Sequence, residues 1–303
     1  MSKLESYHHI SVMPKEVIEG LDIKPDGIYV DATMGGAGHA NLILSALGPE
    51  GKLIVFDQDE DAWANAPKDS RVILIKENFQ HLYRFLDYHG FLNVDGVLAD
   101  LGVSSHHFDT PDRGFSTRFD GPLDMRMDKR MEVTAADIIA NYSKQELQEM
   151  LSRYGEVRNS KTIAEVLVKE RDLRPIRTIQ DLKIILQSYV RGTEARYWAQ
   201  VFQAFRMEVN QEIQVLGNFL KDAVDVLAKD GRLVVITFHS LEDRLVKSFF
   251  RNGGYLEPIP KNMMGQEEWP RQMKEIMNKV ASEEELKENN RSRSARLRVG
   301  VKF

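Results

Sequence analysis

The chain has 303 residues, of which 42% are hydrophobic and 29% charged, and its formal net charge is −5. This length suits one or two domains with a large core, and no apolar run reaches transmembrane length. The absence of cysteine excludes disulfides and thiolate sites, and the negative charge argues against a protein that coats nucleic acid electrostatically. We therefore expect a globular, cytoplasmic protein.

The N-terminal residues predict a short helix that leads into the first strand. Pro14 stands where the first turn of a helix accepts proline, and apolar residues follow it at helical spacing up to Leu21. His8 and His9 precede this helix without a third ligand spaced near them. We expect both histidines to have surface or packing roles rather than to bind a metal.

The segment from Ile28 to His39 is the one around which the chain is organised. It reads I-Y-V-D-A-T-M-G-G-A-G-H, an apolar run followed by three glycines in four residues. A buried strand that enters a glycine-rich turn and then a helix is the first unit of a doubly wound α/β nucleotide-binding fold. The dinucleotide fingerprint G-x-G-x-x-G fits poorly, because its third glycine position here is Asn41.

Two aspartates stand at the ends of predicted strands around this loop. Asp31 closes the first strand, and Asp57 closes a second strand over residues 52–57, about 20 residues beyond the loop. A carboxylate at the second position can accept hydrogen bonds from both ribose hydroxyls of a nucleoside. The pattern therefore indicates an S-adenosylmethionine site. The alternative is an ordinary strand–helix–strand turn with a solvated aspartate.

Strands and helices continue to alternate as far as Asp100. A helix over 59–66, a strand over 71–76, an amphipathic helix after Phe79 and a strand over 95–100 follow one another. Strands that alternate with helices in this way predict a parallel sheet with right-handed crossovers, the α/β doubly wound architecture.

The alternation stops after the fourth strand. Residues 101–128 read as a long loop, and loops of that length in compact domains are usually functional or disordered. Helix start signals follow at Thr134, Ser143 and Thr178, each with an acidic residue three positions later. We interpret residues 107–205 as a helical insertion at the ligand edge of the sheet.

The sheet is expected to resume after the insertion. An amphipathic helix over 213–227 precedes a strongly apolar strand over 231–238. The sequence H-S-L-E-D-R (239–244) then lies at the strand end where doubly wound folds place ligands. Residues 261–290 are charge-rich and predict a mobile or lightly packed excursion, and residues 296–303 alternate basic and apolar side chains as a half-exposed strand would.

Seven sequence motifs follow one another along nearly the whole chain. Each motif is weak evidence alone, but the seven in this order are specific. They are K-P-D-G-I-Y-V-D-A-T-M-G-G-A-G-H, D-L-G-V-S-S, R-G-F-S-T-R, G-P-L-D-M-R-M-D, V-F-Q-A-F-R-M-E-V-N-Q-E-I, I-T-F-H-S-L-E-D-R-L-V-K and N-N-R-S-R-S-A-R-L-R-V. With these motifs the chain resembles the bacterial 16S rRNA (cytosine-N4)-methyltransferases. That family modifies a cytidine in the decoding region of the small ribosomal subunit.

The resemblance implies a class I S-adenosylmethionine-dependent methyltransferase, a Rossmann-like doubly wound sheet with an inserted all-helical subdomain. It implies two methyltransferase parts, over residues 1–106 and 206–303, and a substrate-recognition insertion over 107–205. No metal site is implied. The cofactor contacts, carried over by position, fall on Ala37, Gly38, His39, Asp57, Phe79, Asp100 and His107.

Two of these positions depart from the family pattern. The family usually has glycine where Ala37 stands, and a proline–glutamine pair where His106 and His107 stand. The alanine methyl is small, so we expect Ala37 to keep a backbone contact. At His107 an imidazole replaces an amide.

The implied reaction is N4 methylation of a cytidine in 16S rRNA within the small subunit, with S-adenosyl-L-methionine as cofactor and no membrane partner. The exocyclic amine is a weak nucleophile, because its lone pair is delocalised into the ring, so an acceptor for its N–H groups is needed. Asp100, at a strand end, is the candidate catalytic residue, and a cofactor-binding or structural role is its alternative. Phe79 could stack on adenine or belong to the core.

Several further residues receive weaker assignments from the sequence. His239 is expected to line the substrate pocket, with Asp243 and Arg244 as a structural pair. Arginines of the insertion and the basic C-terminal segment are candidates for phosphate contacts. They are Arg113, Arg118, Arg126, Arg206 and residues 291–303.

Two other functions remain as alternatives to the rRNA methyltransferase. A non-catalytic ribosome-assembly factor would keep the fold, but retention of Asp31, Asp57 and Asp100 with the glycine loop argues against it. An amino-methylating DNA enzyme would carry D/N-P-P-Y/F after the fourth strand, where this chain reads D-L-G-V.

Overall fold

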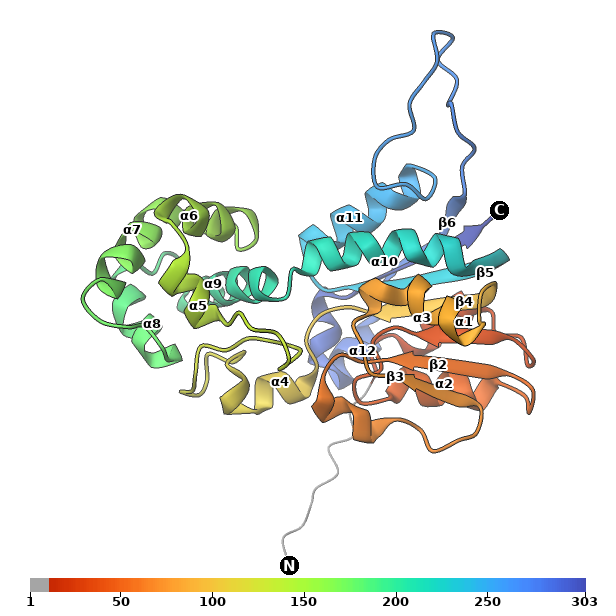
Figure 1. Cartoon of the computed structure of the whole chain (residues 1–303), viewed down its shortest axis with the longest axis horizontal. Helices are drawn as coiled ribbons and strands as arrows, with labels where there is room; N and C mark the ends of the chain where they lie inside the picture. The colour runs from red at the N-terminus through yellow and green to blue at the C-terminus, as the bar shows by residue number, and fades with distance from the viewer. Residues whose placement is uncertain (1–10) are drawn as a thin grey trace, which may run out of the picture. The chain divides into compact units, whose positions relative to one another are not determined.

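The computed structural model describes residues 11–303, apart from the side chains of Ser105 and Asn290. His8 and His9 therefore lie outside the described residues. The chain divides into two compact units, which we call the sheet unit and the helical unit (Figure 1). The sheet unit comprises the described residues up to Gly102 together with Gln214–Phe303, and the helical unit is Val103–Ile213.

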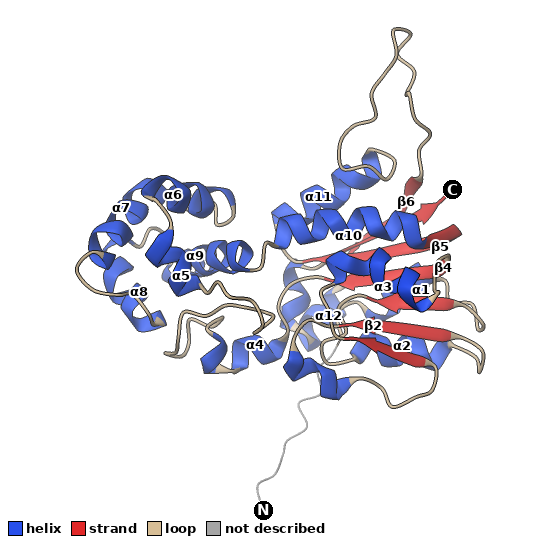
Figure 2. Ribbon diagram, viewed as in Figure 1, coloured by secondary structure: helices blue, strands red, loops and turns tan. Residues whose placement is uncertain are grey.

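A seven-stranded sheet forms the centre of the sheet unit, in the order β3-β2-β1-β4-β5-β7-β6 (Figure 2). The strands are β1 (Ile28–Asp31), β2 (Lys52–Phe56), β3 (Val72–Ile75), β4 (Val94–Asp100), β5 (Leu227–Thr237), β6 (Met273–Val280) and β7 (Arg296–Lys302). The strands from β3 to β5 in this order are parallel, whereas β7 is antiparallel to both of its neighbours. The predicted doubly wound α/β fold is confirmed.

The strand order reverses at β1, which pairs with β2 on one side and β4 on the other. In an open parallel sheet, ligands bind outside the carboxyl ends of the strands at this point of reversal. The carboxyl ends of β1, β2 and β4 are therefore the place to look for a site.

Helices cover both faces of the sheet, because successive strand residues point to opposite sides and both sides are apolar. On one face, α3 (Leu82–His89), α10 (Glu212–Val226) and α11 (Ser240–Arg251) contribute to a buried cluster with strand residues such as Val97. On the other, α1 (Pro14–Leu21) and α2 (Gly38–Ala46) pack around residues such as Leu98. No helix in the described part of the chain is both long and apolar enough to cross a membrane.

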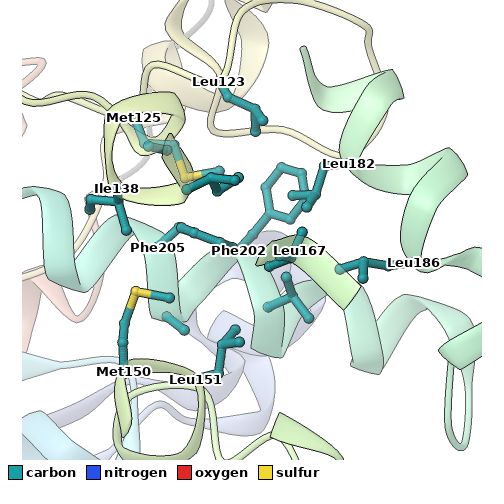
Figure 3. Close-up of a cluster of buried hydrophobic side chains, with 14 of the residues drawn as sticks. Leu123, Met125, Ile138, Met150, Leu151, Leu167, Leu182, Leu186, Phe202 and Phe205 are labelled. Atoms are coloured by element: carbon teal, nitrogen blue, oxygen red, sulfur yellow. The ribbon is translucent and has the colours of Figure 1, made fainter. Parts of the chain in front are cut away.

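The helical unit has a hydrophobic core of its own, in which Met150, Leu182, Phe202 and Phe205 are among the buried side chains (Figure 3). Its helices are α4 (Ser105–Asp109), α5 (Ala135–Asn141), α6 (Lys144–Arg153), α7 (Ser160–Arg171), α8 (Ile179–Leu186) and α9 (Glu194–Val209). The unit extends a few residues beyond the expected 107–205 at each end, in part because α9 runs past residue 205.

The three predicted helix start signals are confirmed. Thr134, Ser143 and Thr178 are the N-cap residues of α5, α6 and α8, and each forms a capping box with the acidic residue three positions later. Each box satisfies two backbone N–H groups that would otherwise lack partners in the first turn, so the short helices begin at defined residues.

Residues 261–290 were expected to form a mobile or lightly packed excursion, and this expectation is wrong for β6, which pairs with β7 in the sheet. The helix α12 (Glu283–Glu288) in the same segment has no buried residue and fits light packing. In β6 the buried and partly buried positions carry Met273, Glu275, Met277 and Lys279, and the exposed positions carry Lys274, Ile276, Asn278 and Val280. Apolar and polar residues thus occur on both sides of the strand, so no apolar alternation marks it in the sequence. Because β6 covers it, β7 is an interior strand with a buried centre rather than a half-exposed edge.

Candidate functional site

Backbone hydrogen bonds join the glycine loop to the carboxyl ends of β2 and β4. The Gly35 N–H donates to Asp57 Oδ2 over 2.7 Å, and the Met34 N–H donates to the Phe56 carbonyl over 2.9 Å. The Asp100 N–H donates to Thr33 Oγ1 over 2.8 Å. The loop, Asp57 and Asp100 therefore lie together at the point where the strand order reverses.

The glycine loop adopts backbone conformations that favour glycine. Gly35 has a φ of 49°, and Ala37, the N-cap of α2, has a φ of 60°. This left-handed region costs roughly 1 kcal/mol or more for a residue with a Cβ. This cost explains why glycine, the residue that the family usually has at this position, is favoured there. Alanine has the smallest side chain that can replace it. Gly38 then opens α2, with its first N–H groups at the loop.

Asp57 follows β2, and each of its carboxylate oxygens accepts a backbone N–H, one of them from the glycine loop. Oδ2 accepts from Gly35, and Oδ1 accepts the Asp59 N–H over 2.8 Å. Burial raises the pKa of Asp57 to about 6, although these two N–H groups act to lower it. Each carboxylate oxygen has a second lone pair, so the side chain can still accept hydrogen bonds from a ribose.

Asp31, His39 and Asp100 direct unsatisfied polar atoms into the same place. Asp31 Oδ2, His39 Nδ1 and Asp100 Oδ1 are buried and have no hydrogen-bond partner within the described part of the chain. His39 Nε2 and Asp100 Oδ2 are 3.5 Å apart. Buried polar groups are ordinarily paired, so these atoms fit a polar ligand with N–H or O–H donors. The ribose hydroxyls and ammonium group of S-adenosylmethionine are such donors.

The electrostatics of this group follow from burial and from the opposed charges. Burial raises the pKa of Asp31 to about 6. Burial alone would lower the pKa of His39, but the carboxylates of Asp100 and Asp31, with Glu285 behind them, raise it overall. The imidazole of His39 therefore favours the ionised form of Asp31, whereas the neighbouring Asp100 carboxylate raises the pKa of Asp31 further.

Asp31→Asn is expected to stabilise the fold at high pH and not at low pH. Because burial raises the native pKa above the unfolded one, the native state holds the Asp31 proton between about pH 4 and pH 6, where the unfolded chain loses it. Ionised Asp31 thus lowers stability above pH 6. The variant should gain up to about 3 kcal/mol of unfolding free energy at pH 8 and almost none at pH 4, by urea denaturation.

Asp69→Asn is the control, because its effect on the free energy of unfolding at high pH is expected to have the opposite sign. Its hydrogen bonds with Arg71 hold the pKa of Asp69 down at about 2, so its ionised form stabilises the native state above the unfolded pKa. That variant should lose stability at pH 8 and lose less as the pH falls towards the native pKa. For Asp31→Asn, a gain in unfolding free energy that is the same at pH 8 and at pH 4 would contradict the raised pKa of Asp31.

Phe79 starts the short 3₁₀ turn η2 (Phe79–His81) beyond β3, and the Asn78 side chain caps that turn. Its half-buried ring meets the ring of Phe219 on α10 edge-to-face, with centroids 5.2 Å apart. Part of the ring thus belongs to the core, as one of the two sequence interpretations held. The ring is not fully covered, so stacking on a base stays a prediction.

His107 belongs to the helical unit, unlike the other six predicted cofactor contacts. It is the third residue of α4, where its Nδ1 accepts the Ser104 N–H over 3.2 Å in a capping box. Its ring stacks on Phe115 with centroids 4.7 Å apart. These contacts explain why a histidine is accommodated there, and its cofactor contact stays a prediction.

The segment after β5 differs from expectation. His239 is the N-cap of α11 and its Nε2 lies 3.0 Å from Glu242 Oε1, while buried Glu242 also accepts the Phe238 N–H. Asp243 pairs with Arg298 on β7 over 2.8 Å, so the structural pair predicted between Asp243 and Arg244 is wrong. The partner lies more than fifty residues away in sequence, and no local pattern indicates it.

Most of the arginines assigned to phosphate are engaged within the fold. Arg113 is buried and donates to the carbonyls of Arg126 and Met127. Arg126 forms a bidentate ion pair with Asp124, and Arg206 forms one with Glu212. Arg298 pairs with Glu275 as well as with Asp243. The side chain of Arg118 is 61% exposed, although it pairs with Asp109. Of the insertion arginines considered, Arg118 is thus the best placed to meet a ligand.

The family model described as the MraW methylase family matches residues 6–303 of this chain. The chain belongs to the MraW methylase family. The protein named ribosomal RNA small subunit methyltransferase H in Flavobacterium psychrophilum is 50% identical over 96% of this chain and 100% of its own length. The protein of the same name in Parabacteroides distasonis is 49% identical, with both chains fully covered.

Membership of the MraW methylase family confirms the resemblance found in the sequence motifs. The sheet order agrees with the class I, Rossmann-like methyltransferase fold. The chain is a methyltransferase, and its cofactor is S-adenosyl-L-methionine. Motif reasoning noted Asp31 but missed Thr33 and Glu242, whose hydrogen bonds to Asp100 and Phe238 are visible only in three dimensions.

Proposed function

We propose that this methylase transfers a methyl group to the N4 amine of a cytidine in the decoding region of 16S rRNA, within the small ribosomal subunit. The observation that carries the proposal is the nearly full-length identity of about half to proteins named for small-subunit rRNA methylation. The seven family motifs support the finer choice of the cytidine N4 atom. The cytoplasmic location expected from the sequence agrees with a ribosomal substrate.

Six residues of the sheet unit, Asp100 among them, are proposed to hold the cofactor. The loop residues Gly38 and His39 offer backbone N–H groups and an imidazole, next to Ala37, whose own N–H donates to the Met34 carbonyl, and Asp57 accepts from the ribose. Phe79 is proposed to contact the adenine. His107 of the helical unit is proposed as the seventh contact. When bound, S-adenosylmethionine supplies a methyl group on a sulfonium that is ready for nucleophilic attack.

Asp100 is proposed as the catalytic residue. Its Oδ1 is buried and has no hydrogen-bond partner among residues 11–303, so it is available to accept a hydrogen bond from the amine of the target base. Accepting that bond raises electron density on the nitrogen and prepares the site for the proton that the amine must lose. The imidazole Nε2 of His39 lies 3.5 Å from the other carboxylate oxygen, Asp100 Oδ2.

The helical unit is proposed to recognise the RNA. A cytidine within a folded ribosomal helix must leave its stack before its amine can enter an enzyme site. Recognition of the surrounding RNA requires a surface beyond the cofactor site, and the separate core of the helical unit allows it to present one. Exposed Arg118 is the candidate on that unit for a contact with RNA.

Transfer of a labelled methyl group from S-adenosylmethionine to small subunits that lack the modification tests the proposal. Digestion to nucleosides should place the label in N4-methylcytidine. Asp100→Asn is the matched control, since it keeps the shape of the side chain and should abolish most of the transfer. Label in another nucleoside would refute the N4 assignment, and subunit binding without any transfer would favour the assembly-factor alternative.

A further inference from the structure

Thr33 connects the ends of two neighbouring strands through one side chain. It lies two residues beyond β1, where the chain turns into the glycine loop. Its backbone N–H donates to Asp31 Oδ1 over 3.1 Å, and its Oγ1 accepts the Asp100 N–H over 2.8 Å. The bond to Asp31 is local, whereas the bond to Asp100 depends on the pairing of β1 with β4 and cannot be read from the sequence.

The hydrogen bond to Asp100 continues the ladder between β1 and β4 by one rung. In a parallel pair, alternate residues of a strand direct their N–H and C=O groups to the same neighbour. The Leu98 carbonyl accepts the Ala32 N–H, and the Leu101 N–H donates to β5. The Asp100 N–H therefore faces β1, which has already ended, and Thr33 Oγ1 stands where the next carbonyl would be.

The turn that carries Thr33 is itself held by Asp31. An aspartate side chain that accepts the N–H two residues later forms an Asx turn, which fixes the backbone locally. The side chain of Thr33 is thereby directed at the end of β4. The carboxylate of Asp100 projects from that same residue, next to His39 Nε2 at 3.5 Å.

We propose that Thr33 is a positioning residue, whose hydroxyl fixes the backbone of Asp100 so that the carboxylate is directed at the reacting amine. The inference rests on the role proposed above for Asp100. Without the hydroxyl, the N–H of Asp100 loses its acceptor, and the end of β4 keeps its bond to β5 through the Leu101 N–H but loses its tie to the turn after β1. A carboxylate on a strand end that is held less firmly is positioned less exactly, and small misplacements of a reacting group lower rates strongly.

Thr33→Val and Thr33→Ser form a matched pair of tests. Valine keeps the shape and the branched Cβ but removes the hydroxyl, and it leaves the backbone N–H to Asp31 in place. Serine keeps the hydroxyl. We expect Thr33→Val to lower kcat for methyl transfer by about ten- to a hundredfold, and Thr33→Ser to stay within about threefold of the unchanged protein, by the same argument.

Two further measurements separate positioning from other effects. The affinity for S-adenosylhomocysteine, measured by calorimetry, should change less than kcat, because the bonds of Asp57 to the loop do not involve the Thr33 hydroxyl. Hydrogen exchange of the Asp100 amide, measured by NMR on cofactor-free protein, should be faster in Thr33→Val than in Thr33→Ser. This second readout needs no activity, and it reports the proposed bond directly.

Unchanged exchange at Asp100 in Thr33→Val would overturn the inference, as would accelerated exchange with normal kcat. Equal losses of kcat in the valine and serine variants would also overturn it, because serine keeps the acceptor. If the unchanged protein transfers no methyl group to cytidine, the proposed function fails. The exchange difference between the two variants would then still decide whether Thr33 fixes Asp100.

Discussion

Asp57→Ala is expected to weaken binding of S-adenosylmethionine by about a hundredfold or more. Hydrogen bonds to a charged acceptor contribute about 1.5–3 kcal/mol each, and a ribose offers two hydroxyl donors to this carboxylate. The substitution also removes the acceptor of the Gly35 and Asp59 N–H groups, so the glycine loop loses an anchor as well. Calorimetric titration with S-adenosylmethionine measures the combined effect.

Asp95→Ala is the matched control for this experiment. Asp95 also lies on a strand of the sheet and accepts a backbone N–H, that of Ile28, but it is near the amino end of β4, away from the proposed site. It should leave the cofactor affinity unchanged. Equal affinity in Asp57→Ala and the unchanged protein would remove Asp57 from the ribose site. Equal losses in both alanine variants would indicate general destabilisation instead.

Asp100→Asn is expected to lower kcat by about a hundred- to a thousandfold, since general base and charge-stabilising groups typically contribute factors of that size. The amide keeps the shape of the side chain but loses the charge, and it accepts a proton far more weakly than a carboxylate. Single-turnover methyl transfer at saturating cofactor isolates this step from binding.

The affinity of Asp100→Asn for S-adenosylhomocysteine distinguishes the two roles open to Asp100. A catalytic role predicts a large fall in kcat with a small change in affinity. If the affinity falls as much as the rate does, Asp100 is a cofactor contact and the amine has another acceptor. Asp95→Asn, which changes an aspartate near the other end of the same strand, should leave both quantities unchanged.

Local sequence patterns correctly predicted those strands and helices whose buried positions coincide with the apolar positions of the repeating pattern. The strand that ends at Asp31, the strand that ends at Asp57 and the helix caps at Thr134 and Ser143 all lie where expected. The region predicted as a helix over 59–66 forms a 3₁₀ helix, η1 (Glu60–Asn65), instead. A 3₁₀ helix has about 3.0 residues per turn and an α-helix about 3.6, and a segment of 6 residues is too short for its apolar spacing to separate them.

The ion pairs of β6 and β7 show where such patterns are insufficient. Glu275 occupies an inward position of β6 because it pairs with Arg298, whose side chain is only 3% exposed. A buried charge is tolerated when its partner is brought to it. That partner is more than twenty residues away, so from the sequence alone Arg298 resembles a surface arginine free to bind phosphate.

The sequence by itself determined the alternating strands and helices from β1 to β4, the glycine loop, and the aspartates at the ends of β1 and β4 and directly after β2. These features depend on neighbours within a few positions, whose periods and turn residues can be read along the chain. The tertiary structure alone decided that Thr33 completes the ladder to Asp100, that Asp243 pairs with Arg298, and that β7 lies inside the sheet. Those outcomes depend on which strands pair, because pairing brings together groups that are remote in sequence and satisfies their hydrogen bonds and charges at once.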